Sequence, residues 1–293
     1  MDLKKYRVGT SGKLKLSKFS TSTDSDKKKK KDGKEELSKD IESISDLQYK
    51  LFAEDRQSLL IIFQGMDASG KDGAIKHIMN GINPQGVAVH SFKHPTTHEL
   101  EHDYLWRHVL KLPEHGQITI FNRSHYENVL IAKVHPEIVL AERLPGIQKV
   151  SDITEKFWEK RYKQISAFEK NLNQNGTGIL KFFLHISKKE QAQRLIDRID
   201  DRERHWKYSS GDIVERGHWD EYQKAYESAL SSTSSEKSPW YIIPADEKES
   251  ARSLIGKIIL EKLREMNPVF PEVSKDELDK MKAAKIELLK EIK

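Results

Sequence analysis

The sequence contains no cysteine. Disulfide bonds and thiolate metal sites are therefore excluded, and the chain is compatible with a reducing compartment. Long apolar runs are also missing, because no stretch approaches the roughly 18–20 residues that a membrane-spanning helix requires. The first residues, Met-Asp-Leu-Lys-Lys, lack the apolar core of a secretory signal. We therefore expect a cytoplasmic protein with no membrane partner.

Charge of both signs, in contrast, is abundant. Charged residues make up 33% of the 293 residues and hydrophobic residues 36%, and the net charge is +5. A basic balance favours a polyanionic partner such as nucleic acid, anionic lipid or a phosphate chain. Part of the positive charge lies in the run 27–31, within a stretch rich in Ser, Thr, Asp and Lys. A solvated tail is the simpler interpretation of that run.

The chain divides into three expected parts. Residues 1–33 have no periodic apolar pattern and are expected to form a disordered or extended basic tail. Residues 34–270 are expected to form one catalytic domain, with a lid at about 188–230, because a chain of this length can bury a single large core. Residues 271–293 are expected to add a C-terminal helix.

Apolar runs of strand length alternate with helical patterns along the central part. The expected strands are 58–64, 87–92, 117–121, 179–186 and 240–244. The expected helices begin with an amphipathic one from residue 35 to 51 and continue at 72–80, 97–110, 127–133, 152–173, 188–205, 215–230, 246–265 and 275–291. Five strands alternating with helices indicate an α/β fold, a three-layer αβα sandwich around a parallel sheet.

A phosphate-binding loop is predicted after the first strand. Residues 65–72 read Gly-Met-Asp-Ala-Ser-Gly-Lys-Asp, which fits G-x-x-x-x-G-K between an apolar strand and a helix. The strand and helix on either side argue against a chance glycine-rich turn. Loop glycines let amide groups face a phosphate, and the helix adds its positive end. The residues expected to bind phosphate here are Gly65, Ala68, Ser69, Gly70, Lys71, Asp72, Gly73 and Lys76.

Two aspartates make this loop unusual. Asp72 stands where a Ser or Thr hydroxyl normally binds Mg²⁺, so the metal must be held differently. Asp67 would repel bound phosphate unless a divalent cation lay between them. We therefore expect Asp67 to bind Mg²⁺ (or Mn²⁺). The alternative is a structural hydrogen bond from loop amides to the Asp67 carboxylate.

The end of the third strand carries a second set of candidates. P-loop enzymes place an acidic residue there to help hold magnesium, but this chain has Asn122. Its amide can coordinate the metal or orient water. Arg123 is expected to point into the crevice at the carboxyl ends of the strands. Glu127 is either a further metal ligand or a salt-bridge partner of Arg123, and the sequence leaves both open.

Arginines follow the fourth strand. Arg194, Arg198 and Arg202 are spaced by four, so one helical face would carry three guanidinium groups able to clamp phosphates. The alternative is a solvated helix with pairs to its own acidic residues. Mobile Arg-bearing lids at this position in nucleotide kinases favour the first interpretation.

Two further groups of residues are expected to be structural. Four aromatic residues are expected to pack within the lid rather than to stack on a base: Trp206, Trp219, Tyr222 and Tyr226. Four histidines are spaced by four, but a proline interrupts any single helix through them and no carboxylate accompanies them, so no metal site is expected: His90, His94, His98 and His102.

Three motifs together resemble those of the polyphosphate kinase 2 family, across roughly residues 35–270. They are Gln-Gly-Met-Asp-Ala-Ser-Gly-Lys-Asp-Gly at 64–73, Phe-Asn-Arg-Ser-His-Tyr-Glu-Asn-Val-Leu at 121–130, and the lid residues from Glu190-Gln191 to Trp206-Lys207 with Asp212, Trp219 and Tyr222. The sequence departs from much of the family at Asn122, where Asp is common, and at His125, where Trp is common.

The resemblance implies an enzyme with Mg²⁺ and a thymidylate-kinase-like αβα fold. It implies phosphoryl transfer from inorganic polyphosphate to AMP, ADP or both, in a reaction that can run backward. The Asn-Arg-Ser-His-Tyr-Glu version resembles the subgroup acting on both nucleotides. A homo-oligomer, dimer or tetramer, is also implied, and nucleic acid is not expected as a partner.

Roles for the candidate residues follow from this resemblance. Lys71, the loop amides and Lys76 are expected to bind the end of the polyphosphate, with Lys207 in the same lid motif. Asn122 belongs to the catalytic group with Asp67 and Lys71. Arg123 and the lid residues Arg194 and Arg198 would bridge donor and acceptor phosphates, and Arg123, Glu127 and Arg194 would contact the nucleotide. Two rivals remain: an ATP-dependent nucleoside monophosphate kinase, and a non-catalytic polyanion-binding protein or P-loop switch.

Overall fold

The computed structural model of the chain describes residues 2–10, 12–23 and 27–292. Its centre is one parallel sheet in the order β2-β3-β1-β4-β5. The strands are β1 (Ser58–Gln64), β2 (Val87–Ser91), β3 (Ile118–Asn122), β4 (Thr177–His185) and β5 (Trp240–Pro244). All seven residues of β1 are buried, as a strand covered on both faces requires.

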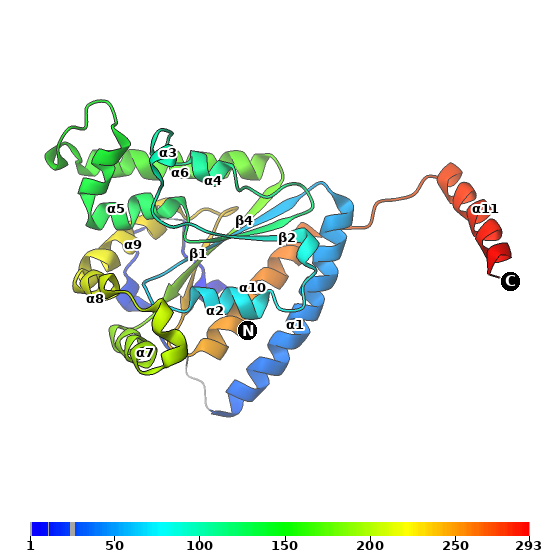
Figure 1. The fold of residues 1–293 in the computed structure, drawn as a ribbon, viewed down its shortest axis with the longest axis horizontal. Helices are drawn as coiled ribbons and strands as arrows, with labels where there is room; N and C mark the ends of the chain where they lie inside the picture. The colour runs from blue at the N-terminus through cyan, green and yellow to red at the C-terminus, as the bar shows by residue number, and fades with distance from the viewer. Residues whose placement is uncertain (1, 11, 24–26, 293) are drawn as a thin grey trace.

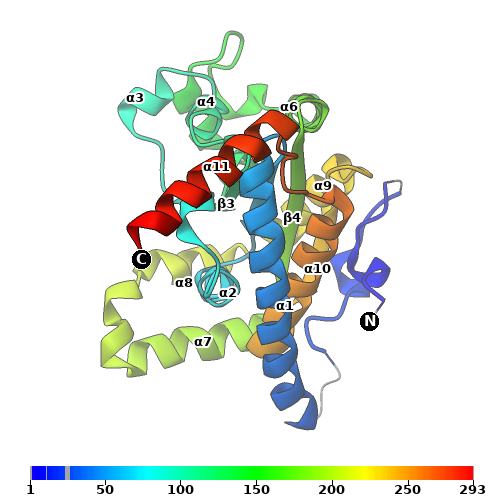
Figure 2. The ribbon, with the colours of Figure 1, turned by 90° about the vertical axis from the view of Figure 1, so that its right-hand side faces the viewer.

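Helices cover both faces of the sheet, as Figures 1 and 2 show. One layer consists of α1 (Lys27–Glu54), α2 (Lys71–Ile78) and α10 (Lys248–Met266). The other consists of α4 (Trp106–Val109), α5 (Ile131–Val134), α6 (Glu155–Gln174) and α9 (Trp219–Thr233), with the short α3 (Thr97–Leu100) beside it. The expected three-layer α/β sandwich is confirmed.

The register of the sheet brings the candidate motifs together. Phe63 in β1 lies beside Asn122 in β3 and Phe182 in β4, so these three strands end at the same edge. The phosphate-binding loop leaves β1 at that edge. The lid, which contains α7 (Lys188–Asp200) and α8 (Ser210–Gly217), follows β4 at the same edge (Figure 1).

The expected single helix at 97–110 is wrong, because two short helices, α3 and α4, occupy this segment with a break between them. The side chain of Asp103 accepts a hydrogen bond from the Leu105 amide, at 2.9 Å, before α4 begins. Such a local bond offers the backbone an alternative to the helical ladder. The helix expected at 127–133 is likewise a 3₁₀ turn, His125–Val129, followed by α5.

The segment before α1 contains an arm packed on the domain, so of the two expected alternatives, disordered or extended, the disordered one is wrong for the described residues. Tyr6, Val8 and Leu16 are buried. The amide of Val8 donates to the carbonyl of Trp240 at 2.8 Å, beside an antiparallel bridge between Arg7 and Tyr241 on β5. Helix α1 begins at Lys27, eight positions before the expected start, and the side chains of the basic run 27–31 lie outside the described residues.

At the other end, α11 (Lys275–Glu291) stands away from the domain (Figure 1). Figure 2 shows it across α1 only in projection. All its described residues are exposed. The segment that leads to it is fastened by Phe270, whose ring meets that of Tyr49 edge-on with centroids 5.8 Å apart. In the part of the chain described here, none of the helices has the length and apolarity to cross a bilayer.

Candidate active site at the carboxyl edge of the sheet

A cavity of about 950 Å³ lies between the phosphate-binding loop and the lid. Residues from the loop, α2, the ends of β2 and β3, the lid and the start of α10 form its walls. Most predicted site residues line it: Asp67, Ala68, Ser69, Gly70, Lys71, Asp72, Gly73, Lys76, Asn122, Arg123, Arg194, Arg198 and Lys207. Gly65 and Glu127 are outside its lining.

The glycines of the loop have steric reasons that the structure makes explicit. Gly70, which precedes the first residue of α2, has a φ of 106°, in the left-handed region that favours glycine. A Cβ on Gly65 would lie 3.0 Å from the backbone oxygen of Leu184 in β4. A Cβ on Gly73 would lie 3.3 Å from a guanidinium nitrogen of Arg252. The loop is therefore built for close approach of backbone and cations.

Lys71 lies inside the loop. Its Nζ donates to the carbonyls of Gly65, at 2.6 Å, and Met66, at 3.2 Å, and its side chain is buried. Burial, with a smaller contribution from Arg123, lowers the pKa of this amine. A buried cation held only by carbonyl oxygens is poised to exchange them for phosphate oxygens.

Arg123 pairs with Asp67 across the mouth of the cavity, Nη2 to Oδ1, at 2.9 Å. Its backbone adopts the left-handed conformation, with φ of 62°, at the point where β3 ends. Burial lowers the pKa of Arg123, but Glu127 and Asp67 outweigh that effect and raise it. Burial raises the pKa of Glu127 despite Arg123. Among the described residues no ion pair joins Glu127 to Arg123, so the salt-bridge alternative for Glu127 is not observed, and Asp67 is the carboxylate that pairs with Arg123.

Asn122 is explained by Asp72. The amide nitrogen of Asn122 donates to Oδ1 of Asp72 at 2.8 Å and to Oγ of Ser91 at 3.3 Å. An aspartate at 122 would set two carboxylates against each other, which is unfavourable unless a proton or cation lies between them. Burial raises the pKa of Asp72, but the Asn122 hydrogen bond and the nearby Lys207 amine together lower it. The Nζ of Lys207 lies 3.7 Å from Oδ2 of Asp72, and this ion pair connects the lid to α2.

Arg194 differs from the expectation. It is buried and donates through Nε to Glu190, at 2.8 Å. Its Nη1 donates to the carbonyls of Ala68 and Ser69, at 3.2 and 2.9 Å, and its Nη2 to those of Ala245 and Asp246, at 2.6 and 2.9 Å. A guanidinium has five N–H donors, and all five are engaged. Arg194 therefore holds the loop to the end of β5, and offers no free donor to a phosphate or a nucleotide in this arrangement.

Only part of the predicted arginine face exists. Helix α7 ends at Asp200, so Arg202 starts a 3₁₀ turn and is outside the cavity lining. Arg198 does line the cavity, where its Nη1 donates to Oδ2 of Asp212 at 2.7 Å and to the carbonyl of Lys207 at 3.0 Å. From the lid, the cavity lining thus receives Arg198 on α7 and Arg204 and Lys207 on the segment that follows, rather than three arginines along one helical face.

Four cations in the cavity lining escaped the sequence predictions: Lys93, Arg204, Lys248 and Arg252. Lys248 and Arg252 lie four positions apart in the first turns of α10, directly after β5. Because parallel strands end at one edge, the argument that places the cations after β4 in the site also applies to the cations that follow β5. Burial and the charge of Arg194 lower the pKa of Lys248, which reflects the crowding of positive charge here.

The aromatic residues divide into two groups. Trp219, Tyr222 and Tyr226 are buried, as expected for lid packing. Trp206 is 79% exposed and lines the cavity, so its expected packing role is wrong.

Two of the four spaced histidines, His98 and His102, pack against the ring of Trp106. His102 stacks on Trp106 with centroids 3.9 Å apart, next to His98. No cluster of three or more His, Cys, Asp and Glu side chains with metal-binding geometry occurs within the described ranges.

Oxygen donors for a hard cation are nevertheless present at the cavity. The carboxylates of Asp67 and Asp72 and the amide of Asn122 line it, and the side chains of both aspartates reach solvent. Mg²⁺ is typically bound through one or two carboxylates, with water and substrate phosphates completing its octahedron. The donor set fits such an ion, whereas a site built from protein ligands alone would need a larger cluster.

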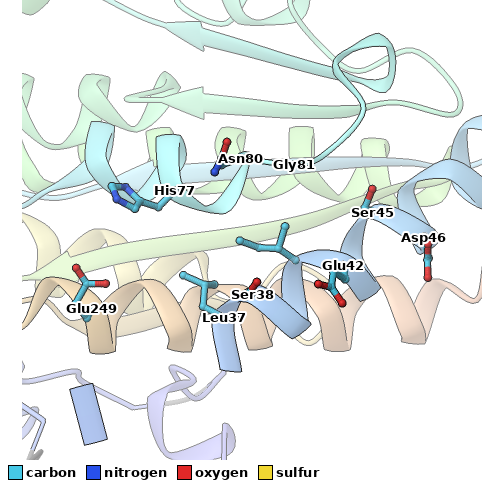
Figure 3. Close-up of a pocket in the computed structure, with 10 residues that line it drawn as sticks. Leu37, Ser38, Glu42, Ser45, Asp46, His77, Asn80, Gly81 and Glu249 are labelled. Carbon is cyan, nitrogen blue, oxygen red and sulfur yellow. The ribbon is translucent and has the colours of Figure 1, made fainter. Parts of the chain in front are cut away.

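A second hollow, of about 590 Å³, lies on the helical layer between α1, α2 and α10 (Figure 3). Its charged side chains are Glu42, Asp46 and Glu249, with His77 nearby (Figure 3). This acidic lining repels phosphate. The cavity at the carboxyl edge of the sheet, which is lined by cations, is therefore the better candidate for binding an anion.

Comparison with known proteins covers most of the chain. A family model described as "Polyphosphate kinase 2 (PPK2)" matches residues 27–271. An "ADP-polyphosphate phosphotransferase" of Rhodopseudomonas palustris is 48% identical, over 92% of this chain and 93% of that protein. An "AMP/ADP-polyphosphate phosphotransferase" of Meiothermus ruber is 41% identical, over 92% of this chain and 96% of that protein.

The fold also matches a solved structure. The crystal structure of a polyphosphate kinase 2 from Arthrobacter aurescens superposes with a TM-score of 0.85 and 36% identity, over 96% of this chain and 95% of that one.

Proposed function

Because the chain belongs to the polyphosphate kinase 2 family, we propose that it transfers a phosphoryl group from inorganic polyphosphate to AMP and to ADP, giving ADP and ATP. The observation that carries this proposal is the concentration of cations in one cavity on both sides of the phosphate-binding loop. They are Lys71, Lys76, Lys93, Arg123, Arg198, Arg204, Lys207, Lys248 and Arg252. A polyphosphate has a negative charge on every unit and no base, so only cations and amides can recognise it.

The two sides of the loop suit the two substrates. Lys76 lies on α2, and Lys248 and Arg252 lie on α10. A long anionic chain can extend along these side chains, away from its reacting end. Asn122 and Arg123 lie at the end of β3, on the other side of Lys71. We assign the first side to the donor chain and the second to the phosphate of the acceptor.

Transfer needs positioning more than proton transfer. An oxygen of the acceptor phosphate, already ionised near neutral pH, forms the new P–O bond to the terminal phosphorus. The bridging P–O bond breaks, and the shortened chain keeps the bonding electrons on its new terminal oxygen. Lys71 and Arg123 are placed to neutralise the charge that develops on these oxygens. The same contacts also accelerate the reverse reaction, because both directions pass through the same transition state.

Magnesium is part of the proposal through Asp67. A bound Mg²⁺ would neutralise phosphate charge and hold donor and acceptor oxygens in line. Asp67 now accepts from Arg123, so in the loaded enzyme this carboxylate would be shared between the arginine and the ion. Asp72, which accepts a hydrogen bond from Asn122 and stands in the position of the usual hydroxyl, would be the second carboxylate available to hold the ion.

The acceptor and the donor are tested together. Purified protein is incubated with Mg²⁺ and AMP, ADP, GMP or GDP, with polyphosphate or ATP as the donor, and products are separated by chromatography. We expect ADP from AMP and ATP from ADP with polyphosphate, and no ADP from AMP when ATP is the sole donor. ADP formed with ATP alone would instead identify an ATP-dependent nucleoside monophosphate kinase. Binding of both substrates without any transfer would identify a non-catalytic polyanion-binding protein.

Two substitutions test the assigned roles. Asp67→Asn and Lys71→Ala are each expected to lower kcat by roughly 100-fold or more, the size of effect seen when one transition-state contact is removed. Asp67→Asn is also expected to raise the Mg²⁺ concentration needed for half-maximal rate, which Lys71→Ala should leave unchanged. Glu42→Gln, in the acidic hollow behind α2, serves as the control and should retain full activity. A near-normal rate in either active-site variant contradicts its role.

A further inference from the structure

The tip of the lid carries an aromatic side chain that the reaction as described does not use. Trp206 lies in the 3₁₀ segment Arg202–Lys207, between α7 and α8. It is 79% exposed, although an indole is among the largest apolar groups a protein has to bury. It nevertheless lines the active-site cavity together with its neighbour, Lys207.

Hydrogen bonds on both sides hold this segment in place. The side chain of Asp201 accepts from the amide of Glu203 at 3.0 Å, which caps the segment at its start. The ring of His205 contacts the carbonyl of Ile199 at 2.8 Å. Arg198 donates to the carbonyl of Lys207, at 3.0 Å, and also to Asp212. The exposure of Trp206 is therefore a property of an ordered turn, because the backbone around the indole is tied to α7 and α8.

Contacts of the adjacent residue place the tip on the acceptor side of the cavity. Lys207 Nζ lies 3.7 Å from Asp72, which bonds to Asn122, which in turn bonds to Ser91 at the end of β2. The cavity wall there continues as Val89, which is 47% exposed, and Phe92. Apolar surface thus faces the same space as the cations.

Polyphosphate has no apolar group that could pack against these side chains. Polyphosphate consists of charged tetrahedral units, and it gains nothing from an indole face. The nucleobase is the flat and weakly polar part of the acceptor, and stacking on an aromatic ring is the usual way in which proteins bind a base without reading its identity. A Trp held open at the mouth of a polyanion cavity therefore fits the acceptor.

We propose that Trp206 stacks on the base of the acceptor nucleotide and so sets the affinity for AMP and ADP. This inference rests on the proposed function and deepens it. Stacking makes use of a π-face that every base has, so the lid tip should accept adenine and guanine alike and should prefer these larger purines to pyrimidines. The acceptor would then bind through its phosphate at Arg123 and through its base at the lid, with discrimination by ring size rather than by hydrogen bonds.

The test separates the acceptor from the donor. Trp206→Ala and Trp206→Phe are compared with Tyr208→Ala, a matched control two positions away that is 49% exposed but does not line the cavity. KM is measured for AMP and ADP at saturating polyphosphate, and for polyphosphate at saturating nucleotide. We expect Trp206→Ala to raise the acceptor KM by about 5- to 150-fold, the range set by base–aromatic stacking, and to leave the polyphosphate KM unchanged. Trp206→Phe should restore most of the affinity, and Tyr208→Ala should behave as the wild type.

A binding measurement without turnover completes the test. Calorimetric titration with ADP, in the absence of polyphosphate, should show the same loss of affinity in Trp206→Ala. An unchanged acceptor KM, or an equal rise in both KM values, overturns the stacking role and indicates that the indole packs on the domain or contacts the phosphate chain. A wild-type protein that binds ADP through Trp206 but transfers nothing from polyphosphate would overturn the proposed function and leave the stacking role standing.

Discussion

Arg194 joins three segments of the site through one side chain. It connects the loop carbonyls at residues 68–69, the end of β5 and its own helix. Lysine cannot reproduce this, because it has a single nitrogen and no planar fork. The role of Arg194 is thus to position the loop that surrounds Lys71.

Arg194→Lys is expected to lower both stability and kcat. At least two hydrogen bonds are lost, which corresponds to roughly 2 kcal/mol of unfolding free energy. Urea unfolding and steady-state kinetics measure the two effects. Arg264→Lys is the control, since Arg264 lies outside the cavity lining and makes an exposed pair with Glu261 that should contribute little. A variant of normal stability, weakened only in its affinity for polyphosphate, would restore the direct phosphate-binding role.

Three buried histidines, His108, His125 and His185, each with a pKa lowered by burial, give the protein a predictable sensitivity to acid. Burial, and next the charge of His125, lower the pKa of His108 to about 2, and burial also lowers the pKa of His125 itself. An unfolded histidine titrates near 6.5, so below that pH the unfolded state takes up protons that the folded state does not. Stability is therefore complete above pH 6.5 and falls as the pH decreases.

His108→Phe should remove one of these three contributions. The phenyl ring preserves contact with Phe92, whose centroid lies 4.3 Å from that of His108. The wild type is expected to lose about 1.4 kcal/mol per pH unit for each buried histidine below pH 6.5, and the variant should lose correspondingly less. Urea unfolding at pH 7 and pH 5 measures the difference. The same pH slope in both proteins would show that His108 titrates normally.

At the scale of the element, predictability follows the range of the forces involved. Four of the five strands were predictable because each is a short apolar run whose residues are mostly buried. None of the residues of β2 is buried, and that strand was recognisable only as a short run that follows a turn-rich segment. The break between α3 and α4 depends on the side-chain bond of Asp103, and the sequence pattern alone does not show which way that carboxylate turns. The sequence pattern alone likewise does not show that α7 ends at Asp200, before Arg202.

The candidate site shows a similar division. Residues 65–73 were predictable because the phosphate-binding loop is a local motif. Arg194 was misassigned because residue type indicates a cation, whereas the number of carbonyl groups around it depends on β5 and the loop meeting in space. Trp206 was misassigned because indole rings are usually buried, and its exposure depends on how the lid folds.

Helix α11 is expected to be dispensable for catalysis. None of its described residues is buried or lines the cavity, and an isolated helix of this length is marginal in water. A chain that ends at residue 274 should keep the kcat, the KM values and the melting temperature of the full chain. Thermal unfolding and the polyphosphate assay test this together. A marked loss of activity would show that α11 acts on the site through a contact absent here.

At the scale of the whole molecule, the arm at residues 2–23 is the opposite case. Burial of Tyr6, Val8 and Leu16 contributes about 1.5–3 kcal/mol for each side chain, and folded proteins are stable by only about 5–15 kcal/mol. Deletion of residues 1–23 should therefore lower the melting temperature by about 10 °C or more, if two or three of these contributions are lost. Scanning calorimetry of this deletion beside the α11 deletion makes each the control for the other. Equal melting temperatures would show that the arm does not contribute to stability.

The pairing of the arm with β5 also bears on the order in which the chain takes shape. The hydrogen bond from Arg7 to the carbonyl of Glu236 spans 229 positions of the 293-residue sequence. Contacts between such distant residues close the longest loops, and they form after the local ones. The arm is synthesised before β5, yet it cannot settle until β5 has joined the sheet. Until the arm has packed against β5, this strand lies at an open edge of the sheet and can pair with any other extended strand. The contacts of Val8 and its neighbours are thus among the last to form in the domain. They cover the edge strand through which two partly folded copies would otherwise pair.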